Sequence, residues 1–197
     1  MKRASVLFLA IITLIGLVFG GFLISSPNKT TNPADFLYRA GSPVKGSGNA
    51  SVKISIFSDY LCSYCKDAHT IINDVFSNNG RDVAIYYRNL IVHENSKIFA
   101  QAALASNKQG KFAQFDNILF EREIEPTEEA VINIAKEIGL NIDTFKSDLN
   151  SEETKSIMIQ DEEDAISLQV RGTPTIFLND QQIEDFRTLP NLIKNMI

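Results

Sequence analysis

The fold of this chain is decided by one short stretch, which holds both of its cysteines: Phe57-Ser58-Asp59-Tyr60-Leu61-Cys62-Ser63-Tyr64-Cys65. Only two residues separate Cys62 from Cys65, so a disulfide between them closes a very small loop. A loop of that size removes little conformational entropy from the unfolded chain, and the bond adds correspondingly little stability. The spacing therefore favours a bond that is made and broken during function over a structural one.

The residues on either side of the cysteines predict a strand, a helix and a second strand. Apolar and polar residues alternate from Val52 to Ile56, which is the period of a strand. A helix is expected from about Ser63, because apolar residues recur at helical spacing: Ala68, Ile71, Ile72, Val75 and Phe76. Residues 83–92 then form the second strand. This order predicts a βαβ unit with parallel strands and a right-handed crossover.

The second half of the chain predicts a block of helices followed by a return to strands. From about residue 95 to residue 168 the apolar residues keep a helical period, which indicates four or five helices. A strand is expected at residues 175–178, then a short strand near Ile183 and a last helix from about Leu189. The expected architecture is one α/β domain over residues 51–197, with an inserted helical subdomain at about 95–168.

The N-terminal residues 1–24 are expected to be a membrane anchor or a signal peptide. Residues 4–24 carry no charge, and as a helix they would be about 31 Å long, enough to cross a hydrocarbon core of about 30 Å. Lys2 and Arg3 precede them, which places the rest of the chain outside the cytoplasm. We favour an uncleaved anchor, because the apolar run is long and its cleavage site is poor. Residues 25–50, rich in Ser, Asn, Pro and Gly, are expected to be a linker with a docked portion near Phe36-Leu37-Tyr38.

Composition excludes some classes of function. Hydrophobic residues make up 44% of the chain and charged residues 22%, which is ordinary for one globular core. The formal net charge is −5 and no basic cluster lies on a predicted face, so nucleic acid is not expected as a partner.

The position of the cysteines at the start of a helix predicts their chemistry. Unpaired backbone N–H groups and the partial positive charge of a helix N-terminus favour a thiolate at Cys62, which would make it the attacking sulfur. Cys65, one turn further in, is expected to be more buried and to resolve a mixed disulfide formed on Cys62. Thr173-Pro174 opens the strand at 175–178, where a proline cannot donate to the ladder. The sequence does not show whether the bond before Pro174 is cis, and without the paired cysteines a trans proline at a strand start would be preferred.

Two segments of the chain resemble the signature segments of the DsbA-like thiol:disulfide oxidoreductases. They are the stretch quoted above and Val170-Arg171-Gly172-Thr173-Pro174-Thr175-Ile176-Phe177-Leu178-Asn179. Between them, three shorter segments resemble the helical insertion of that family: His93-Glu94-Asn95-Ser96, Gln109-Gly110-Lys111-Phe112 and Ile138-Gly139-Leu140. The resemblance implies a thioredoxin-like fold with an inserted helical subdomain, in agreement with the order of elements.

The resemblance also implies roles for the site residues. Cys62 matches the attacking cysteine and Cys65 the resolving one. Pro174 matches a cis-proline that faces them, and the backbone of Thr173 is expected to pair with a bound peptide. Ser63 and Tyr64 form the dipeptide between the cysteines, where the strongest oxidants of the family carry Pro-His. Because Tyr64 offers no imidazolium to the thiolate, we expect a weaker oxidant.

The activity implied is the introduction of disulfides into exported, cysteine-containing proteins at the periplasmic or cell-envelope face. No cofactor is expected besides the redox-active disulfide Cys62–Cys65, and the chain is expected to be a monomer. A membrane partner, DsbB-like or quinone-linked, would reoxidise the pair. Some members of the family carry a buried acid on the first strand, six residues before the attacking cysteine. That position is Ile56 here, so a proton relay through it is not expected, and the role of Asp59 is open.

Three other readings of the same residues stay open. Cys62, Cys65, His69 and His93 could supply four zinc ligands, although a lone C-x-x-C is weak support for a zinc site. A disulfide isomerase or reductase is the alternative within redox chemistry, but residues 25–50 are too few for the N-terminal dimerisation domain of such isomerases. A tethered thioredoxin-like chaperone or binding module would not use the cysteines. His69 and the acidic run at residues 152–164 are expected to lie on solvated helix faces.

Overall fold

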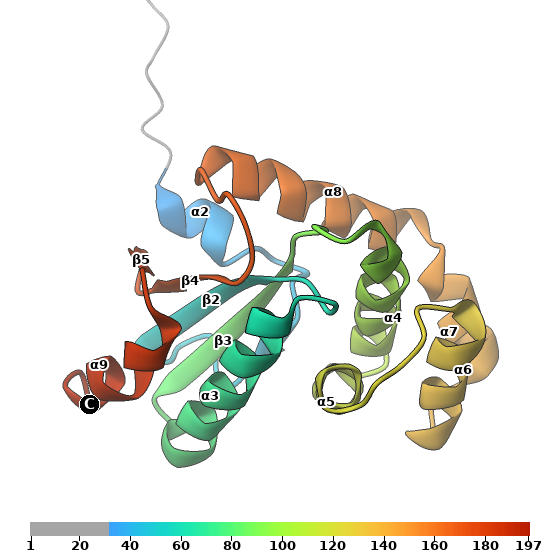
Figure 1. The fold of residues 1–197 in the computed structure, drawn as a ribbon, viewed down its shortest axis with the longest axis horizontal. Coiled ribbons are helices and arrows are strands. Elements are labelled where there is room, and N and C mark those ends of the chain that lie inside the picture. Colours follow the sequence, from blue (N-terminus) through green and yellow to red (C-terminus); the bar gives the residue numbers. More distant parts are fainter. Residues whose placement is uncertain (1–31) are drawn as a thin grey trace, which may run out of the picture. The chain divides into compact units, whose positions relative to one another are not determined.

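The computed structural model describes residues 32–197, which form a five-stranded mixed sheet with helices on both faces and a helical subdomain beside it (Figure 1). The strands are β1 (Val44–Lys45), β2 (Val52–Ser58), β3 (Val83–Asn89), β4 (Thr175–Leu178) and β5 (Gln181–Ile183), in the sheet order β1-β3-β2-β4-β5. β2 and β3 are parallel, and the other pairs are antiparallel. The expected βαβ unit is therefore present, and the strand at Thr175 completes its sheet.

Helices cover both faces of the sheet because its central strands are apolar on both. On one face, α3 (Ser63–Asn79) and α9 (Leu189–Lys194) pack against side chains such as Ile54, Ile85 and Ile176. On the other face, α2 (Pro33–Leu37) and α8 (Glu152–Ser167) enclose Phe57 and Phe177. This two-sided burial is typical of a strand at the centre of an α/β sheet.

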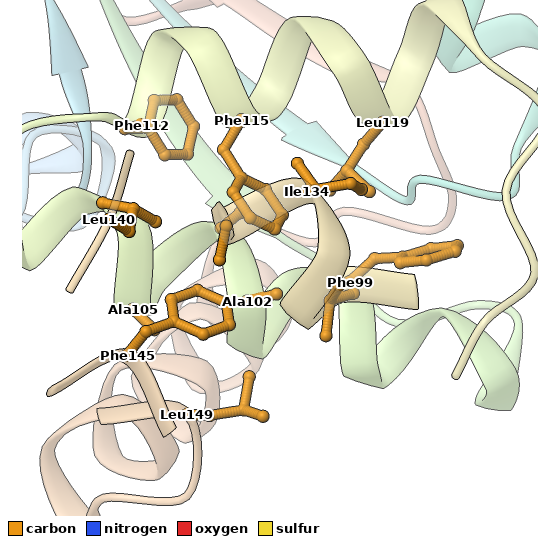
Figure 2. Close-up of a cluster of buried hydrophobic side chains, with 13 residues drawn as sticks. Phe99, Ala102, Ala105, Phe112, Phe115, Leu119, Ile134, Leu140, Phe145 and Leu149 are labelled. Carbon is orange, nitrogen blue, oxygen red and sulfur yellow. The ribbon is translucent and has the colours of Figure 1, made fainter. Parts of the chain in front are cut away.

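The helical subdomain has its own apolar core. It contains the short 3₁₀ helix η1 (Glu94–Ser96), α4 (Lys97–Lys108), α5 (Phe112–Glu121), α6 (Glu128–Glu137) and α7 (Ile142–Leu149), and α8 leads back to the sheet. A second 3₁₀ helix, η2 (Phe186–Thr188), precedes α9. Figure 2 shows the buried cluster, to which α4, α5, α6 and α7 all contribute: Phe99, Ala102, Ala105, Phe112, Phe115, Leu119, Ile134, Leu140, Phe145 and Leu149.

The expected docking near Leu37 is confirmed, and two segments differ in extent from the expectations. The packed part of the linker is longer than expected: α2 and β1 both lie within residues 32–50, and Leu37 is fully buried. The second strand ends at Asn89 and not at residue 92, because the Val92 and His93 N–H groups donate to the Asp59 carboxylate instead of to a strand.

The predicted membrane segment at residues 1–24 lies outside the described residues. Within residues 32–197, no helix combines the length and the apolar character needed to cross a membrane.

Candidate active site

The sheet register brings the two signature segments together. Phe57, at the end of β2, pairs with Thr175 at the start of the antiparallel β4. The chain that leaves β2 therefore meets the chain that enters β4, and this is where Cys62 and Thr173-Pro174 lie. The Thr173–Pro174 bond is cis, as the resemblance implies.

Cys62 is the N-cap residue of α3 and is half-buried. Its backbone carbonyl accepts from the N–H groups of Cys65 and Lys66, which begins the helix. The Cys62 thiol donates to the Thr173 carbonyl, with Sγ and O 3.4 Å apart. No acidic residue lies in the first turn of α3. A negative charge that forms on Cys62 would therefore face the positive end of a helix with no neighbouring carboxylate in that turn.

Cys65 lies one turn further along α3 and is fully buried, as predicted. Burial raises the pKa of the Cys65 thiol to about 11, although contacts with the Asp59 backbone and the Ser58 side chain act to lower it. Both cysteines are free thiols in this structure. The pair therefore combines an accessible sulfur with a buried one that loses its proton reluctantly.

The two residues between the cysteines face solvent. The Tyr64 side chain is 60% exposed, and Ser63 is also exposed. A groove of about 450 Å³ begins at Cys62 and Ser63 and runs along Phe99 and Leu119 of the helical subdomain. A second groove, of about 570 Å³, lies along the loop that carries Thr173 and Pro174. Cys62 lines the first groove, and the second groove reaches Thr173, whose carbonyl contacts the Cys62 thiol.

Asp59 organises the turn that presents Cys62. Its carboxylate is buried and accepts hydrogen bonds from the N–H groups of Leu61, Val92 and His93 and from the Ser96 hydroxyl, at 2.7 to 2.8 Å. These donors come from the segments that directly follow β2 and β3. Asp59 therefore fixes the cysteine turn against the segment that enters the helical subdomain.

His69 is buried, so the prediction of a solvated position was wrong. Its Nε2 lies 3.0 Å from Oδ2 of Asp116, a buried acid on α5, and its ring packs on Phe120 with centroids 4.5 Å apart. The other histidine, His93, is half-exposed and lies 3.4 Å from Asp59. Residues 32–197 contain no group of three or more His, Cys, Asp or Glu side chains placed to hold a metal ion.

The structure brings together all the site residues that the sequence singled out, namely Cys62, Ser63, Tyr64, Cys65, Thr173 and Pro174. Their roles in exchange stay predictions. Sequence reasoning left the role of Asp59 open and did not single out Ser58 or Asp116. Asp59 stands directly after a buried strand, and this was the one local signal available. Asp116 gave no signal, because its partners lie 47 and 56 residues away along the chain.

The chain is similar to known proteins over most of its length. The family model described as thioredoxin matches residues 39–195. Disulfide bond formation protein D of Bacillus subtilis is 31% identical over 162 residues, which cover 74% of this chain and 71% of that protein. The Na(+)/H(+) antiporter NhaA of Herminiimonas arsenicoxydans is 27% identical over 154 residues, 77% of this chain. The chain spans about a quarter of the length of that antiporter.

Solved structures share the fold. A thioredoxin-like oxidoreductase from Silicibacter pomeroyi superposes with a TM-score of 0.75 at 26% identity, over 84% of this chain and 98% of that one. The thiol-disulfide exchange protein alpha-DsbA2 of Wolbachia pipientis has a TM-score of 0.74 at 24% identity, over 83% and 91% of the two chains. At this level of identity, the similarity to alpha-DsbA2 shows a shared fold and no more.

Proposed function

Because this chain belongs to the thioredoxin family, in its DsbA-like branch, we propose that it is a thiol:disulfide oxidoreductase that introduces disulfides into exported proteins through Cys62 and Cys65. The observation that carries the proposal is the position of the Cys62 sulfur. It lies at the N-cap of α3 and 3.4 Å from the carbonyl of Thr173, with Cys65 buried behind it. An accessible sulfur at a helix N-terminus leaves readily as a thiolate, which is what a disulfide oxidant requires.

The exchange starts from the Cys62–Cys65 disulfide. A substrate thiolate attacks the Cys62 sulfur, the bond to Cys65 breaks, and Cys65 leaves with the electron pair. The product is a mixed disulfide between the substrate and Cys62. A second thiolate of the substrate then attacks the substrate sulfur of this bond, and Cys62 leaves as a thiolate. The substrate gains a disulfide, and two electrons have passed to the cysteine pair.

The surface around Cys62 suits an unfolded peptide as substrate. The groove beside Cys62 carries apolar side chains such as Leu61, Phe99 and Ile124, together with Arg122 and Glu125. A groove of about 450 Å³ that combines apolar walls with a few polar groups is within the usual size range of ligand-binding clefts. Beside this groove, the backbone of Thr173 pairs with the extended substrate peptide, as the family resemblance implies. This pairing holds the substrate sulfur against Cys62.

The reduced pair needs an oxidant to complete the cycle. A membrane partner, linked to quinone, accepts the two electrons through a mixed disulfide on Cys62, and Cys65 then restores the resting disulfide. The chain works as a monomer outside the cytoplasm, at a membrane to which residues 1–24 tether it. The exposed Leu61 and Tyr64 beside Cys62 offer this partner an apolar contact.

A trapping experiment tests the proposed chemistry. The full-length chain is produced in cells as Cys65→Ser and as Cys62→Ser, and the thiols are blocked with an alkylating agent before non-reducing electrophoresis. Cys65→Ser should accumulate adducts with exported proteins, because it keeps the attacking sulfur but lacks the resolving one. Cys62→Ser should form none. Adducts that are absent from Cys65→Ser, or equally abundant in both variants, would contradict the mechanism.

The direction of electron flow is tested with the purified protein. Oxidised protein should restore activity to a reduced, disulfide-containing enzyme during refolding, and its reduction potential should lie below about −120 mV, since Tyr64 replaces the histidine of the strongest oxidants. Reduction of insulin without oxidative refolding would indicate a reductase, and neither activity would indicate a binding module. Fractionation of cells and N-terminal sequencing test the location, because a mature chain that begins near Ser26 has lost its anchor.

A further inference from the structure

Behind Cys65 lies a buried polar cluster that the exchange steps above do not use. Nε2 of His69 lies 3.0 Å from Oδ2 of Asp116, and the Tyr60 hydroxyl donates to Oδ1 of the same carboxylate at 2.9 Å. The His69 and Asp116 side chains are 7% and 2% exposed. A histidine and an aspartate at this depth need a reason to be there, because burial of polar groups costs free energy unless their partners compensate.

Cys65 and His69 share the buried face of α3. They are four residues apart, so their Cβ atoms lie within about 6 Å of each other. Ser58, at the end of β2, comes close enough to Cys65 to lower the pKa of that thiol. Yet the Ser58 hydroxyl oxygen is buried and has no hydrogen-bond partner of normal geometry among residues 32–197. A buried hydroxyl in that position can both donate a proton and accept one.

A small cavity connects the Ser58 hydroxyl to the cluster. Its volume is about 20 Å³, and the polar residues that line it include Ser58, Tyr60, His69, Arg88, Asn89 and Asp116. Apolar side chains, among them Ile72 and Phe120, close it from other directions. A single water needs about 10 to 15 Å³ and two to four polar partners, and the cavity offers both.

We propose that this cluster is a proton relay for the resolving cysteine, in which a proton passes between Cys65 and His69 through the Ser58 hydroxyl and one water in the cavity. Asp116 holds the imidazole in position from the helical subdomain. The inference rests on the proposed function, because it concerns the protonation of Cys65 during disulfide exchange. It assigns the task to residues other than position 56, which is isoleucine in this chain.

The relay moves protons only, and the electrons stay with the sulfur atoms. When a substrate thiolate opens the Cys62–Cys65 bond, Cys65 leaves as a thiolate and takes a proton from the relay. During reoxidation Cys65 returns that proton, and its thiolate attacks the Cys62 sulfur of the mixed disulfide with the partner. The partner's sulfur then leaves as a thiolate. Since burial raises the pKa of Cys65 to about 11, a base that accepts this proton accelerates the second sequence.

The groups around His69 leave it as the side chain suited to this task. Burial raises the pKa values of Tyr60, which faces the cavity from the cysteine turn, and of Tyr87 on β3, so both stay neutral. The charged groups are Asp116 on α5, Arg88 on β3, which also lines the cavity, and Lys45 on β1. Lys45 reaches the ring through Asn73: it donates to Asn73 Oδ1 at 2.8 Å, and Asn73 Nδ2 lies 3.2 Å from His69 Nε2. An imidazole can accept a proton on one ring nitrogen and donate one from the other, as a relay requires.

The relay predicts that His69 affects the resolving step and not the attack. Reduced wild-type protein and His69→Gln are mixed with oxidised glutathione between pH 5 and pH 11, quenched with acid and measured by mass spectrometry. The first rate is the formation of the glutathione adduct on Cys62, and the second is its conversion to the Cys62–Cys65 disulfide. Near pH 7, His69→Gln should slow the second step about 100-fold, a modest value for a positioned base, and leave the first unchanged.

The matched control is the exposed neighbour of His69 on the same helix. Thr70 lies outside the cavity, so Thr70→Gln should leave both rates unchanged. The difference between His69→Gln and the wild type should vanish as the pH approaches 11, where hydroxide removes the Cys65 proton without a relay. A resolving step that is as fast in His69→Gln as in the wild type, or that is slowed by one factor at every pH, overturns the relay.

A measurement on the wild type covers the case in which His69→Gln does not fold. In the relay, the protonation of His69 is linked to the state of Cys65, so the NMR titration midpoint of its imidazole should differ between oxidised and reduced protein. Equal midpoints overturn the relay. The proposed function fails separately: if wild-type Cys62 forms no glutathione adduct, the exchange chemistry itself is refuted.

Discussion

At the scale of the residue, the site depends on buried acids that hold other groups in place. Asp59 collects four donors around the cysteine turn, and Asp116 collects Tyr60 and His69 behind it. Hydrogen bonds to a charged carboxylate contribute about 1.5 to 3 kcal/mol each, more than bonds between neutral groups. The position of Cys62 is therefore set by interactions that do not touch its sulfur.

The buried thiol of Cys65 should make the stability of the reduced protein depend on pH. Its pKa is about 11 in the folded chain, against an ordinary thiol value of 9.0. The folded state keeps this proton longer, so the contribution to stability is complete below pH 9 and is lost as the pH rises to 11. The loss in the free energy of unfolding is about 3 kcal/mol. Urea denaturation of reduced protein at a series of pH values measures it.

The control for this effect is Cys65→Ala, also reduced. It keeps every other titratable side chain, so the difference in unfolding free energy between wild type and variant isolates Cys65. That difference should fall between pH 9 and pH 11. If this difference is constant between pH 9 and pH 11, burial does not disfavour the Cys65 thiolate. In that case Cys65 needs no relay to remove its proton.

The sequence could predict those site residues whose signal is local. Cys62 and Cys65 are recognisable from their spacing, and Thr173-Pro174 from its place before a strand. Ser58, His69 and Asp116 could not be assigned a place, because their surroundings depend on contacts between segments far apart in the chain. His69 illustrates this: its helical spacing was compatible with either face of α3, and only Asp116 on α5 explains why it is buried.

At the scale of the element, α8 is attached to the sheet by ion pairs as well as by apolar contacts. Arg88 on β3 is fully buried; its Nε lies 2.6 Å from Asp161, and its Nη2 lies 2.6 Å from Asp164. Arg39 contacts Asp164 from the other side at 2.7 Å. Burial raises the pKa of Asp161. It acts in the same direction on Asp164, but the hydrogen bonds from Arg39 and Arg88 hold the pKa of that carboxyl below its usual value.

These pairs correct the prediction that the acidic run at residues 152–164 lies wholly on a solvated face. Asp161 and Asp164 are each 1% exposed. The helical pattern of α8 is weakly amphipathic, because two of its inward positions are charged. Their partner Arg88 lies 73 residues before Asp161 and stands in a strand, so no periodicity within the run could reveal it. The elements were predictable here, whereas the pairing between them was not.

Arg88→Leu should destabilise the protein severely. The substitution removes the cation but leaves Asp161 and Asp164 buried, and breaking a buried pair in this way costs about 3 to 5 kcal/mol. The free energy of unfolding in urea measures the loss. The double variant R88L/D161N should recover part of it, since it also removes the charge left behind at Asp161.

The matched control is Arg122, which forms a bidentate pair with Glu137 on the surface, where both side chains are about half exposed. Arg122→Leu should leave the unfolding midpoint close to that of the wild type, because solvent screens an exposed pair. Equal losses for Arg88→Leu and Arg122→Leu would mean that the buried pairs do not hold α8 to the sheet.

At the scale of the whole described domain, two apolar cores meet at the active site. One core belongs to the helical subdomain and the other to the sheet with α3 and α9, and Tyr87 is packed against both. Asp116 adds a polar link, because it stands on α5 and binds residues of the cysteine turn and of α3. The order of elements could be predicted from periodicity, which is a local property. The contacts that join the two cores could not be predicted, because they are made between residues far apart in the sequence.

Two cores joined by few contacts should respond separately to substitution. Phe145 on α7 is fully buried and stacks on Phe115 in the cluster of Figure 2, with ring centroids 5.7 Å apart. Phe145→Ala should lower the free energy of unfolding of the subdomain by about 3 to 5 kcal/mol, through lost burial and the cavity left behind. Hydrogen exchange should then accelerate in α4 to α7 more than in β2, β3 and β4.

Ile176→Ala in β4 is the counterpart in the sheet core, and it should accelerate exchange mainly in the strands. If both substitutions accelerate exchange equally everywhere, the subdomain and the sheet unfold as one unit, and Asp116 with Tyr87 binds them more tightly than their few contacts suggest.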